Sequence, residues 1–300
     1  MGLMDWLGLV VLSVIWGSSF LFVELAIEHV GPFTIVLCRV GLAALALILY
    51  CRFKRISIPF DGKHISQYLL MGLIAHTLPF TLLTWGQIHI TAGLASIYNA
   101  TTPLFTVLVA HLCLVDERAS IGKFLGVMTG FFGVAVLIGG GIDGLALNSL
   151  LGQLAALCAA ICYALCAVYA RRFTGLPPAG IAAATLTAAT LMMAPLAFFF
   201  SEPAASLPSA TTLAAIVTLA LLCTAIAYII YYVILARVGA TRLMLVTFLI
   251  PASAIMLGIV FLGETLAPNH IAGLVLIFCG LILVDGQMLR FFTRARAGKA

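Results

Sequence analysis

The composition of the chain excludes a water-soluble globular protein. Its 300 residues are 64% hydrophobic and 8% charged, with a mean hydropathy of +1.22, whereas about a quarter of the residues in a soluble domain are charged. Too few charges remain to cover a surface in water, so we expect lipid to surround most of the chain. The net charge is +5, and the positions of the basic residues indicate that membrane topology accounts for it.

Ten apolar segments follow one another along the chain as candidate transmembrane helices. Such a helix needs about 20 mostly apolar residues, because the hydrocarbon offers no partner to an unpaired backbone group. The first segment has no basic leader and no small-residue cleavage site, which indicates a retained span rather than a signal peptide. The predicted spans are residues 5–27, 34–51, 66–89, 94–115, 121–140, 150–170, 180–200, 212–235, 243–262 and 270–288.

The basic residues agree with ten spans. Cytoplasmic loops are enriched in lysine and arginine, and with both termini in the cytoplasm fourteen of the fifteen basic residues fall on that side. Arg39 is the exception, because it lies within a span. Adding or removing one span would scatter the basic residues over both sides. The loops on the opposite side carry acidic residues instead, at Glu28, Asp143, Glu202 and Glu264.

The two halves of the chain share a spaced pattern of proline, glutamate and glycine. The matching intervals favour a duplication over chance similarity between Gly-rich apolar segments. Because five is an odd number, the second copy enters the membrane from the opposite side. This predicts an all-α fold of two inverted five-helix repeats, residues 1–142 and 143–300, with a binding site between them. The matching residues are Gly93, Pro103, Glu117, Gly126 and Gly133, and then Gly239, Pro251, Glu264, Gly273 and Gly280.

Several short motifs carry a family resemblance. They are Trp16-Gly17-Ser18-Ser19-Phe20, Pro32 followed by Arg39, Asn99-Ala100-Thr101-Thr102-Pro103, and Glu117 and Glu264 with their trailing glycines. Together they resemble the drug/metabolite transporter superfamily, in its EamA branch of ten-helix exporters, over nearly the whole chain. The resemblance implies a multi-pass protein of the cell inner membrane that exports amino acids or related metabolites, with the amino-acid exporters called YddG as the favoured comparison. The second half departs from the pattern, since Tyr163-Ala164 stands where a Trp-Gly pair would recur.

Polar and aromatic residues within the spans predict a central substrate pocket used in alternating access. Polar side chains inside a membrane are costly, so they face a cavity or a partner helix, and such a lining suits a solute with both apolar and polar parts. The alternative is that they only bridge helices, which we favour for single Ser and Thr but not for His76, Tyr98 and Asn99. The predicted substrate-binding residues are Trp16, Ser19, Phe20, His76, Phe80, Tyr98, Asn99, Thr102, Tyr163, Tyr228 and Thr247.

Two charged residues, one histidine and two prolines within the spans have further predicted roles. Because an isolated buried charge is costly, we expect Arg39 to pair with Glu24, and the alternative is that Arg39 holds a substrate carboxylate. His76 titrates near neutral pH, so it is either a proton relay or a buried neutral histidine. Pro103 and Pro251 each remove a backbone hydrogen bond from a span and are expected to be paired hinges or static bends.

No catalytic motif, cofactor or metal site is predicted. Cys158, Cys162 and Cys166 share a helix face, but successive turns hold their thiols about 5 Å or more apart, which favours helix packing over a metal. All eight cysteines lie in or beside apolar segments, where we expect no disulfide. The expected partners are a small-molecule substrate and membrane lipid, with no nucleic acid, and the sequence leaves open whether the protein is a monomer.

The sequence leaves other functions open as alternatives. A carrier of nucleotide sugars or sugar phosphates is disfavoured, because phosphates need several basic groups and only Arg39 lies deep within a predicted span, since Lys123 is at the cytoplasmic end of the span 121–140. A drug carrier is a further alternative within transport. In other classes, the alternatives are an intramembrane enzyme, which would need clustered carboxylates or histidines, and a channel.

Overall fold

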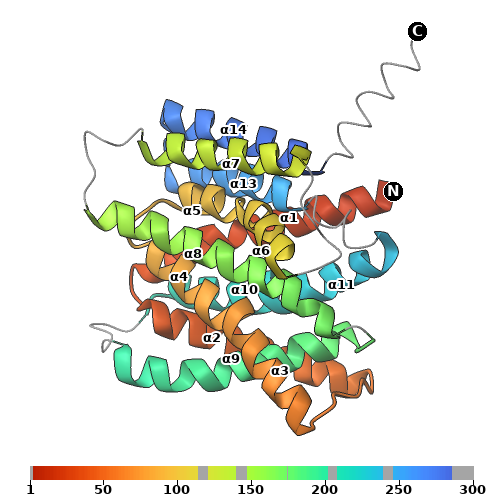
Figure 1. Ribbon diagram of the computed structural model, residues 1–300. Helices are drawn as coiled ribbons and strands as arrows, with labels where there is room; N and C mark the ends of the chain where they lie inside the picture. The colour runs from red at the N-terminus through yellow and green to blue at the C-terminus, as the bar shows by residue number, and fades with distance from the viewer. Residues whose placement is uncertain are drawn as a thin grey trace.

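The structure is a bundle of helices (Figure 1). The computed structural model describes residues 3–113, 121–139, 147–173, 175–201, 208–238 and 246–285, and these residues contain no strand. Three π-helical turns, η1 (Leu73–Thr77), η4 (Leu221–Ile226) and η5 (Gly258–Leu262), interrupt or extend helices, and the 3-10 turn η3 (Ala170–Phe173) follows α8. The α-helices are α1 (Leu3–Ile27), α2 (Pro32–Phe53), α3 (Gly62–Gly72), α4 (Leu78–Gly86), α5 (Ala92–Asn99), α6 (Thr102–Cys113), α7 (Ile121–Gly139), α8 (Leu147–Tyr169), α9 (Pro178–Phe200), α10 (Ala210–Ala220), α11 (Ala227–Val238), α13 (Val246–Leu257) and α14 (Pro268–Asp285).

Seven helices of the described chain are long and apolar enough to cross a membrane. Three shorter apolar helices, Gly122–Val136, Leu249–Leu262 and Pro268–Gly280, coincide with the three other predicted spans. Large apolar side chains cover the outside of the bundle, such as Leu191 with 66% of its surface exposed, which a soluble monomer rarely tolerates. The prediction of an all-helical polytopic membrane protein is confirmed. The seven long helices are Leu3–Ile27, Pro32–Phe53, Gly62–Gly86, Ala92–Cys113, Ser149–Phe173, Pro178–Phe200 and Ala210–Tyr231.

The third and eighth predicted spans each contain a π-helical turn. The turn η1 joins α3 to α4, and η4 joins α10 to α11. Thr77 in η1 and Thr224 in η4 are 147 residues apart, the same interval that separates Glu117 from Glu264. π-helical turns are rare and often lie at functional sites. The matched positions of η1 and η4 therefore make the side chains around these two turns candidates for a functional site.

The helices α7 and α14 lie side by side at one edge of the bundle (Figure 1) and run antiparallel. A Cβ added at Gly133 would lie 2.8 Å from the carbonyl oxygen of Gly273, and one added at Gly280 would lie 2.5 Å from that of Gly126. The two backbones therefore touch, as in the small-residue contacts of other membrane helices. The contact is reciprocal, because Gly126 corresponds to Gly273 and Gly133 to Gly280 in the repeated pattern.

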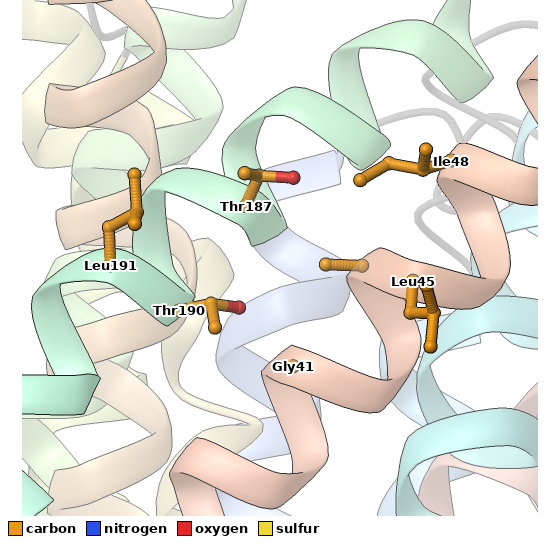
Figure 2. A pocket seen from close by; sticks show the side chains of 7 residues that line it. Gly41, Leu45, Ile48, Thr187, Thr190 and Leu191 are labelled. Carbon is orange, nitrogen blue, oxygen red and sulfur yellow. The ribbon is translucent and has the colours of Figure 1, made fainter.

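A second antiparallel pair, α2 and α9, lies at the opposite edge (Figure 1). The hydroxyl oxygens of Thr34 and Ser201 lie 2.7 Å apart near one end. A pocket opens on the outer side of this pair (Figure 2), and its Thr187 and Thr190 hydroxyls donate to carbonyl groups of their own helix. It is therefore an apolar surface feature and not the predicted central pocket. Its lining residues are Gly41, Ala44, Leu45, Ile48, Thr187, Thr190 and Leu191.

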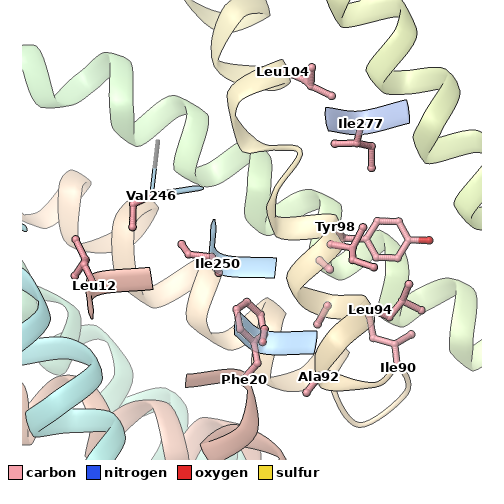
Figure 3. Close-up of a cluster of buried hydrophobic side chains, with 14 of the residues drawn as sticks. Leu12, Phe20, Ile90, Ala92, Leu94, Tyr98, Leu104, Val246, Ile250 and Ile277 are labelled. Atoms are coloured by element: carbon pink, nitrogen blue, oxygen red, sulfur yellow. The ribbon is translucent and has the colours of Figure 1, made fainter. Parts of the chain in front are cut away.

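A buried apolar core joins the two halves of the chain (Figure 3). Leu12 and Phe20 of α1 and Tyr98 of α5 lie in one cluster with Val246 and Ile250 of α13. All five side chains are buried. Side chains from both sides of the predicted repeat boundary thus form a single core, with α1 at the interface between the halves.

Candidate functional site

An aromatic cluster forms where α1, α4 and α11 meet the turn η1. It consists of Trp16, His76, Phe80, Tyr228 and Tyr231. Between ring centroids, His76 lies 5.6 Å from both Phe80 and Tyr228. Trp16 lies 6.4 Å from Tyr228 and 5.7 Å from Tyr231. Four predicted binding residues are therefore brought together from both halves of the chain, and Tyr231 joins them from one turn further along α11.

His76 is a buried histidine with one unpaired ring nitrogen. It is 2% exposed, and its Nε2 lies 3.2 Å from Oγ1 of Thr185 in α9. Its Nδ1 has no hydrogen-bond partner in the part of the chain that the structure describes. A buried polar atom left without a partner costs about 1–3 kcal/mol. The described residues therefore leave one hydrogen-bonding position of this histidine unused.

Arg39 of α2 lies against the aromatic cluster. Its Nε donates a hydrogen bond to Oγ1 of Thr224 at 3.0 Å, and its guanidinium carbon lies 3.9 Å from the centre of the Phe80 ring. Thr224 donates in turn to the carbonyl of Leu219 at 2.8 Å, within the span that carries η4. A hydroxyl and an aromatic face therefore position this buried cation.

The predicted ion pair between Glu24 and Arg39 does not form in the described chain. The Glu24 carboxylate accepts a hydrogen bond from Nε2 of Gln87 at 3.1 Å, and the same amide donates to the carbonyl of Phe20 at 2.9 Å. A neutral amide thus meets the acid, while the π-helical turn presents Thr224 to the arginine. The prediction considered only the cost of burying each charge and not these neutral partners.

Other predicted binding residues point into the core or bond to nearby backbone. The Tyr98 hydroxyl donates to Oε1 of Gln153 in α8 at 2.9 Å, and its ring lies in the core with Phe20 (Figure 3). The Ser19 and Thr102 hydroxyls each donate to the carbonyl three residues earlier. Tyr98, Phe20, Ser19 and Thr102 therefore make none of the contacts that define the aromatic cluster. Trp16 of that cluster does pack against the same core.

Asn99, Tyr163 and Thr247 complete the predicted set. The Oδ1 atom of Asn99 is buried and has no hydrogen-bond partner among the described residues. Tyr163 of α8 packs against the same buried group, between α2 and α9, as Phe80 and Tyr228, so it lies beside the aromatic cluster. Thr247 falls at the start of α13, and its side chain is outside the described part of the structure.

The two predicted hinge prolines occupy different positions in their helices. Pro103 is the second residue of α6, directly after the break that separates α5 from α6. A proline in the first turn removes no helical hydrogen bond, so Pro103 begins α6 after a break within the predicted span, and its role as a hinge stays a prediction. Pro251 does lie inside α13, where its missing N–H leaves a carbonyl of the helix unpaired.

Glu264 caps a helix of the other half, a role that the sequence analysis missed. Its carboxylate accepts the backbone N–H of Ala92 at 2.8 Å and that of Gly93 at 2.9 Å, at the start of α5. A Cβ at Gly93 or Gly258 would lie 2.7 or 2.6 Å from this carboxylate, so both glycines leave room for it. Negative charge at a helix N-terminus is stabilising. The repeated glutamate-glycine spacing was the sequence signal for this cap. Glu117, the matching glutamate of the first half, is outside the described residues.

The cysteines carry no arrangement suited to a metal in the described chain. All eight are free thiols, and the described residues contain no group of three His, Cys, Asp or Glu side chains that could hold an ion. The sulfur of Cys166 lies 3.8 Å from that of Met71 in α3. Its contact is therefore with a neighbouring helix, as expected of packing.

Comparison with known proteins assigns the chain to a family. The sequence profile described as the EamA-like transporter family matches residues 4–139 and again residues 150–285. This chain belongs to the EamA-like transporter family. The predicted resemblance is confirmed, and with it the class of membrane transporter rather than enzyme.

Three similar proteins match this family member over more than nine tenths of its length. The uncharacterized transporter YoaV of Bacillus subtilis is 26% identical over 92% of this chain and 95% of its own. A protein named a probable terminal-alkyne amino-acid exporter, from Streptantibioticus cattleyicolor, is 27% identical over 94% of this chain and 93% of its own. The uncharacterized inner membrane transporter YedA of Escherichia coli is 26% identical over 93% and 90%.

A solved crystal structure shares the fold. The match covers 97% of this chain and 99% of the chain in the solved structure, with a TM-score of 0.69 and 20% sequence identity. At that identity the similarity concerns the fold alone.

Proposed function

We propose that this protein exports neutral amino acids, aromatic ones among them, across the cell inner membrane by alternating access. The observation that carries the proposal is the aromatic cluster, which places the rings of Trp16, Phe80 and Tyr228 beside the buried polar groups of His76 and Arg39. An amino acid has an apolar side chain and two charged groups, which such a lining suits. The relative named a probable amino-acid exporter supports the same substrate class.

The proposed architecture is ten spans in two inverted repeats, residues 1–142 and 143–300. The family profile matches twice, once in each half. The corresponding helices α7 and α14 run antiparallel and touch through the reciprocal pairs Gly133–Gly273 and Gly280–Gly126, and α2 and α9 are also antiparallel. A two-fold axis in the membrane plane makes corresponding helices antiparallel, whereas an axis along the membrane normal would make them parallel. The geometry therefore supports inversion.

The proposed orientation has both termini in the cytoplasm. The Tyr68 ring of α3 stacks on the Phe173 ring at 5.8 Å, which brings the start of α3 and the end of α8 to the same end of the bundle. The exposed basic residues Lys63, Arg171 and Arg172 lie within five residues of these rings in the sequence. Cytoplasmic ends of spans are rich in such residues, which supports this end as the cytoplasmic one.

In the proposed mechanism, the site closes to one side while it opens to the other. Trp16 of α1 and Tyr228 of α11 belong to different halves, so a rocking motion of one half against the other changes the distance between them. The core around Phe20 and Ile250 lies along the same boundary. Substrate held between the halves is then released on the opposite side of the membrane.

The test is exchange by the purified protein in proteoliposomes loaded with unlabelled amino acid. Addition of a radiolabelled panel of amino acids outside should give saturable uptake by counter-transport, strongest for neutral and aromatic members. Liposomes without protein are the control. Flux without counter-transport would indicate a channel, chemical conversion of the solute would indicate an enzyme, and exchange of sugar phosphates in place of amino acids would contradict the proposed substrate.

A further inference from the structure

Arg39 has unused hydrogen-bonding capacity in the middle of the proposed site. A guanidinium carries five N–H donors, and its Nε–H is bonded to Thr224 at 3.0 Å. The described residues provide no hydrogen-bond acceptor for its two Nη groups and no carboxylate that pairs with it. The ion pair that the described chain contains is His64 with Asp61, at the start of α3. Only 8% of the Arg39 surface is exposed.

The described residues around Arg39 do not neutralise its charge. Its electrostatic neighbours in the described chain include Tyr163, Cys223 and Tyr228 and also His76, and none of these groups is an anion in its ordinary form at neutral pH. The Phe80 ring at 3.9 Å covers one face of the guanidinium, which contributes a modest attraction. A buried cation without an anion is costly. The site is therefore incomplete until an anionic group arrives.

We propose that the two free Nη groups of Arg39 bind the carboxylate of the transported solute. Phe80, Tyr228 and Trp16 contact its apolar part, and Nδ1 of His76, which is also buried and unpaired, forms a second polar contact beside the Phe80 ring. This inference rests on the proposed transport function. It narrows the substrate class to monocarboxylates with an aromatic or large apolar group, of which neutral amino acids are one kind.

The chemistry favours a carboxylate over a phosphate. A guanidinium forms two parallel hydrogen bonds with a carboxylate, and the two Nη groups are the ones left unpaired here. One arginine balances one negative charge, while a phosphate monoester carries close to two. The described residues bring no second arginine or lysine to the aromatic cluster.

The experiment measures binding by the purified full-length protein in detergent, from the rise in unfolding temperature with ligand concentration. The three probes are L-phenylalanine, its amide, which lacks the carboxylate, and 3-phenylpropionate, which lacks the amine. We expect both acids to bind at least about tenfold more tightly than the amide, as charge-assisted hydrogen bonds imply. Arg39→Gln should remove this preference, and Arg39→Lys should reduce it. Arg52→Gln, at an exposed position on the same helix, should keep it.

Each outcome decides for or against the carboxylate contact. Equal binding of acid and amide by the unsubstituted protein would overturn it, even if neither Arg39 variant folds. A tenfold preference that persists in Arg39→Gln would also overturn it, and amino-acid exchange could continue in both cases, so the proposed function would stand. Binding of 3-phenylpropionate that depends on Arg39, without any amino-acid exchange, would support this inference and contradict the proposed substrate.

Discussion

At the scale of single residues, the candidate site depends on side chains that meet from distant parts of the sequence. Phe80 contacts both Arg39 and His76, and Tyr228 contacts both His76 and Trp16. Two of these residues, Arg39 and His76, keep polar atoms that the described chain leaves unpaired. Rigid aromatic walls with a few unpaired polar groups are typical of pockets that select a small molecule by orientation.

His76 provides a test of proton coupling at this scale. If the imidazole relays a proton, His76→Ala should abolish the response of uptake to an imposed pH gradient and leave exchange without a gradient intact, because alanine cannot carry a proton. The measurement is uptake into proteoliposomes with and without a gradient. His64→Ala, at the start of α3 outside the aromatic cluster, is the control. An unchanged gradient response in His76→Ala would show that this histidine has a structural role.

Glu264 provides a test of the cap that links the halves. Glu264→Gln should lower the free energy of unfolding by about 1 kcal/mol, since the amide loses the negative charge at the start of α5 and one of the two acceptor oxygens. Thermal unfolding in detergent measures the change. Glu28→Gln makes the same substitution at an exposed position and should have little effect. Equal effects of the two substitutions would contradict the capping role.

At the scale of helices, the sequence predicted where helices exist better than it predicted their shape. The apolar segments could be found because the membrane imposes a minimum length on each span independently of its neighbours. The π-helical turns η1 and η4 could not, since nothing in their composition separates them from regular helix. The predicted pair of Arg39 with Glu24 failed for this reason, because Arg39 bonds instead to Thr224 within η4. The position of Pro103 also depended on a helix break that apolar composition did not reveal.

The contact between α7 and α14 gives a prediction for helix packing. Gly133→Ala should destabilise the protein by about 1–3 kcal/mol, because its Cβ would lie 2.8 Å from the carbonyl oxygen of Gly273 and the helices would have to separate. Thermal unfolding in detergent checks this. Gly62→Ala is the matched control, since a Cβ at that position meets no atom within 4 Å, and it should be neutral or slightly stabilising.

At the scale of the whole molecule, the two halves form one structure and not two domains in contact. The core of Figure 3 contains Leu12 and Phe20 from one half and Val246 and Ile250 from the other. The sequence predicted the repeats from short matching intervals. It could not predict that Trp16 and Tyr228 meet, because that contact depends on how the halves pack, and no local pattern records it.

The topology can be tested with single cysteines introduced into a cysteine-free background. Lys63→Cys and Arg172→Cys should react with a membrane-impermeant thiol reagent only from the cytoplasmic side, and Glu28→Cys only from the outside. Labelling of intact cells and of inverted vesicles measures this. Reaction of Lys63→Cys and Arg290→Cys on opposite sides would show that the number of spans between them is odd, and the ten-span arrangement would be wrong. Arg290 itself is outside the described residues.

The shared core has a consequence for how the protein is made. Tyr98 enters the membrane long before Val246 leaves the ribosome, and at about 5–20 residues per second the 148 residues between them take roughly 7–30 s to synthesise. During that interval α13 is absent, so the apolar side chains of α1 and α5 that pack against it in the finished core lack this cover. Assembly therefore ends only when the final helices arrive, and early termination of translation would leave a fragment with an open apolar seam for quality-control proteases to recognise.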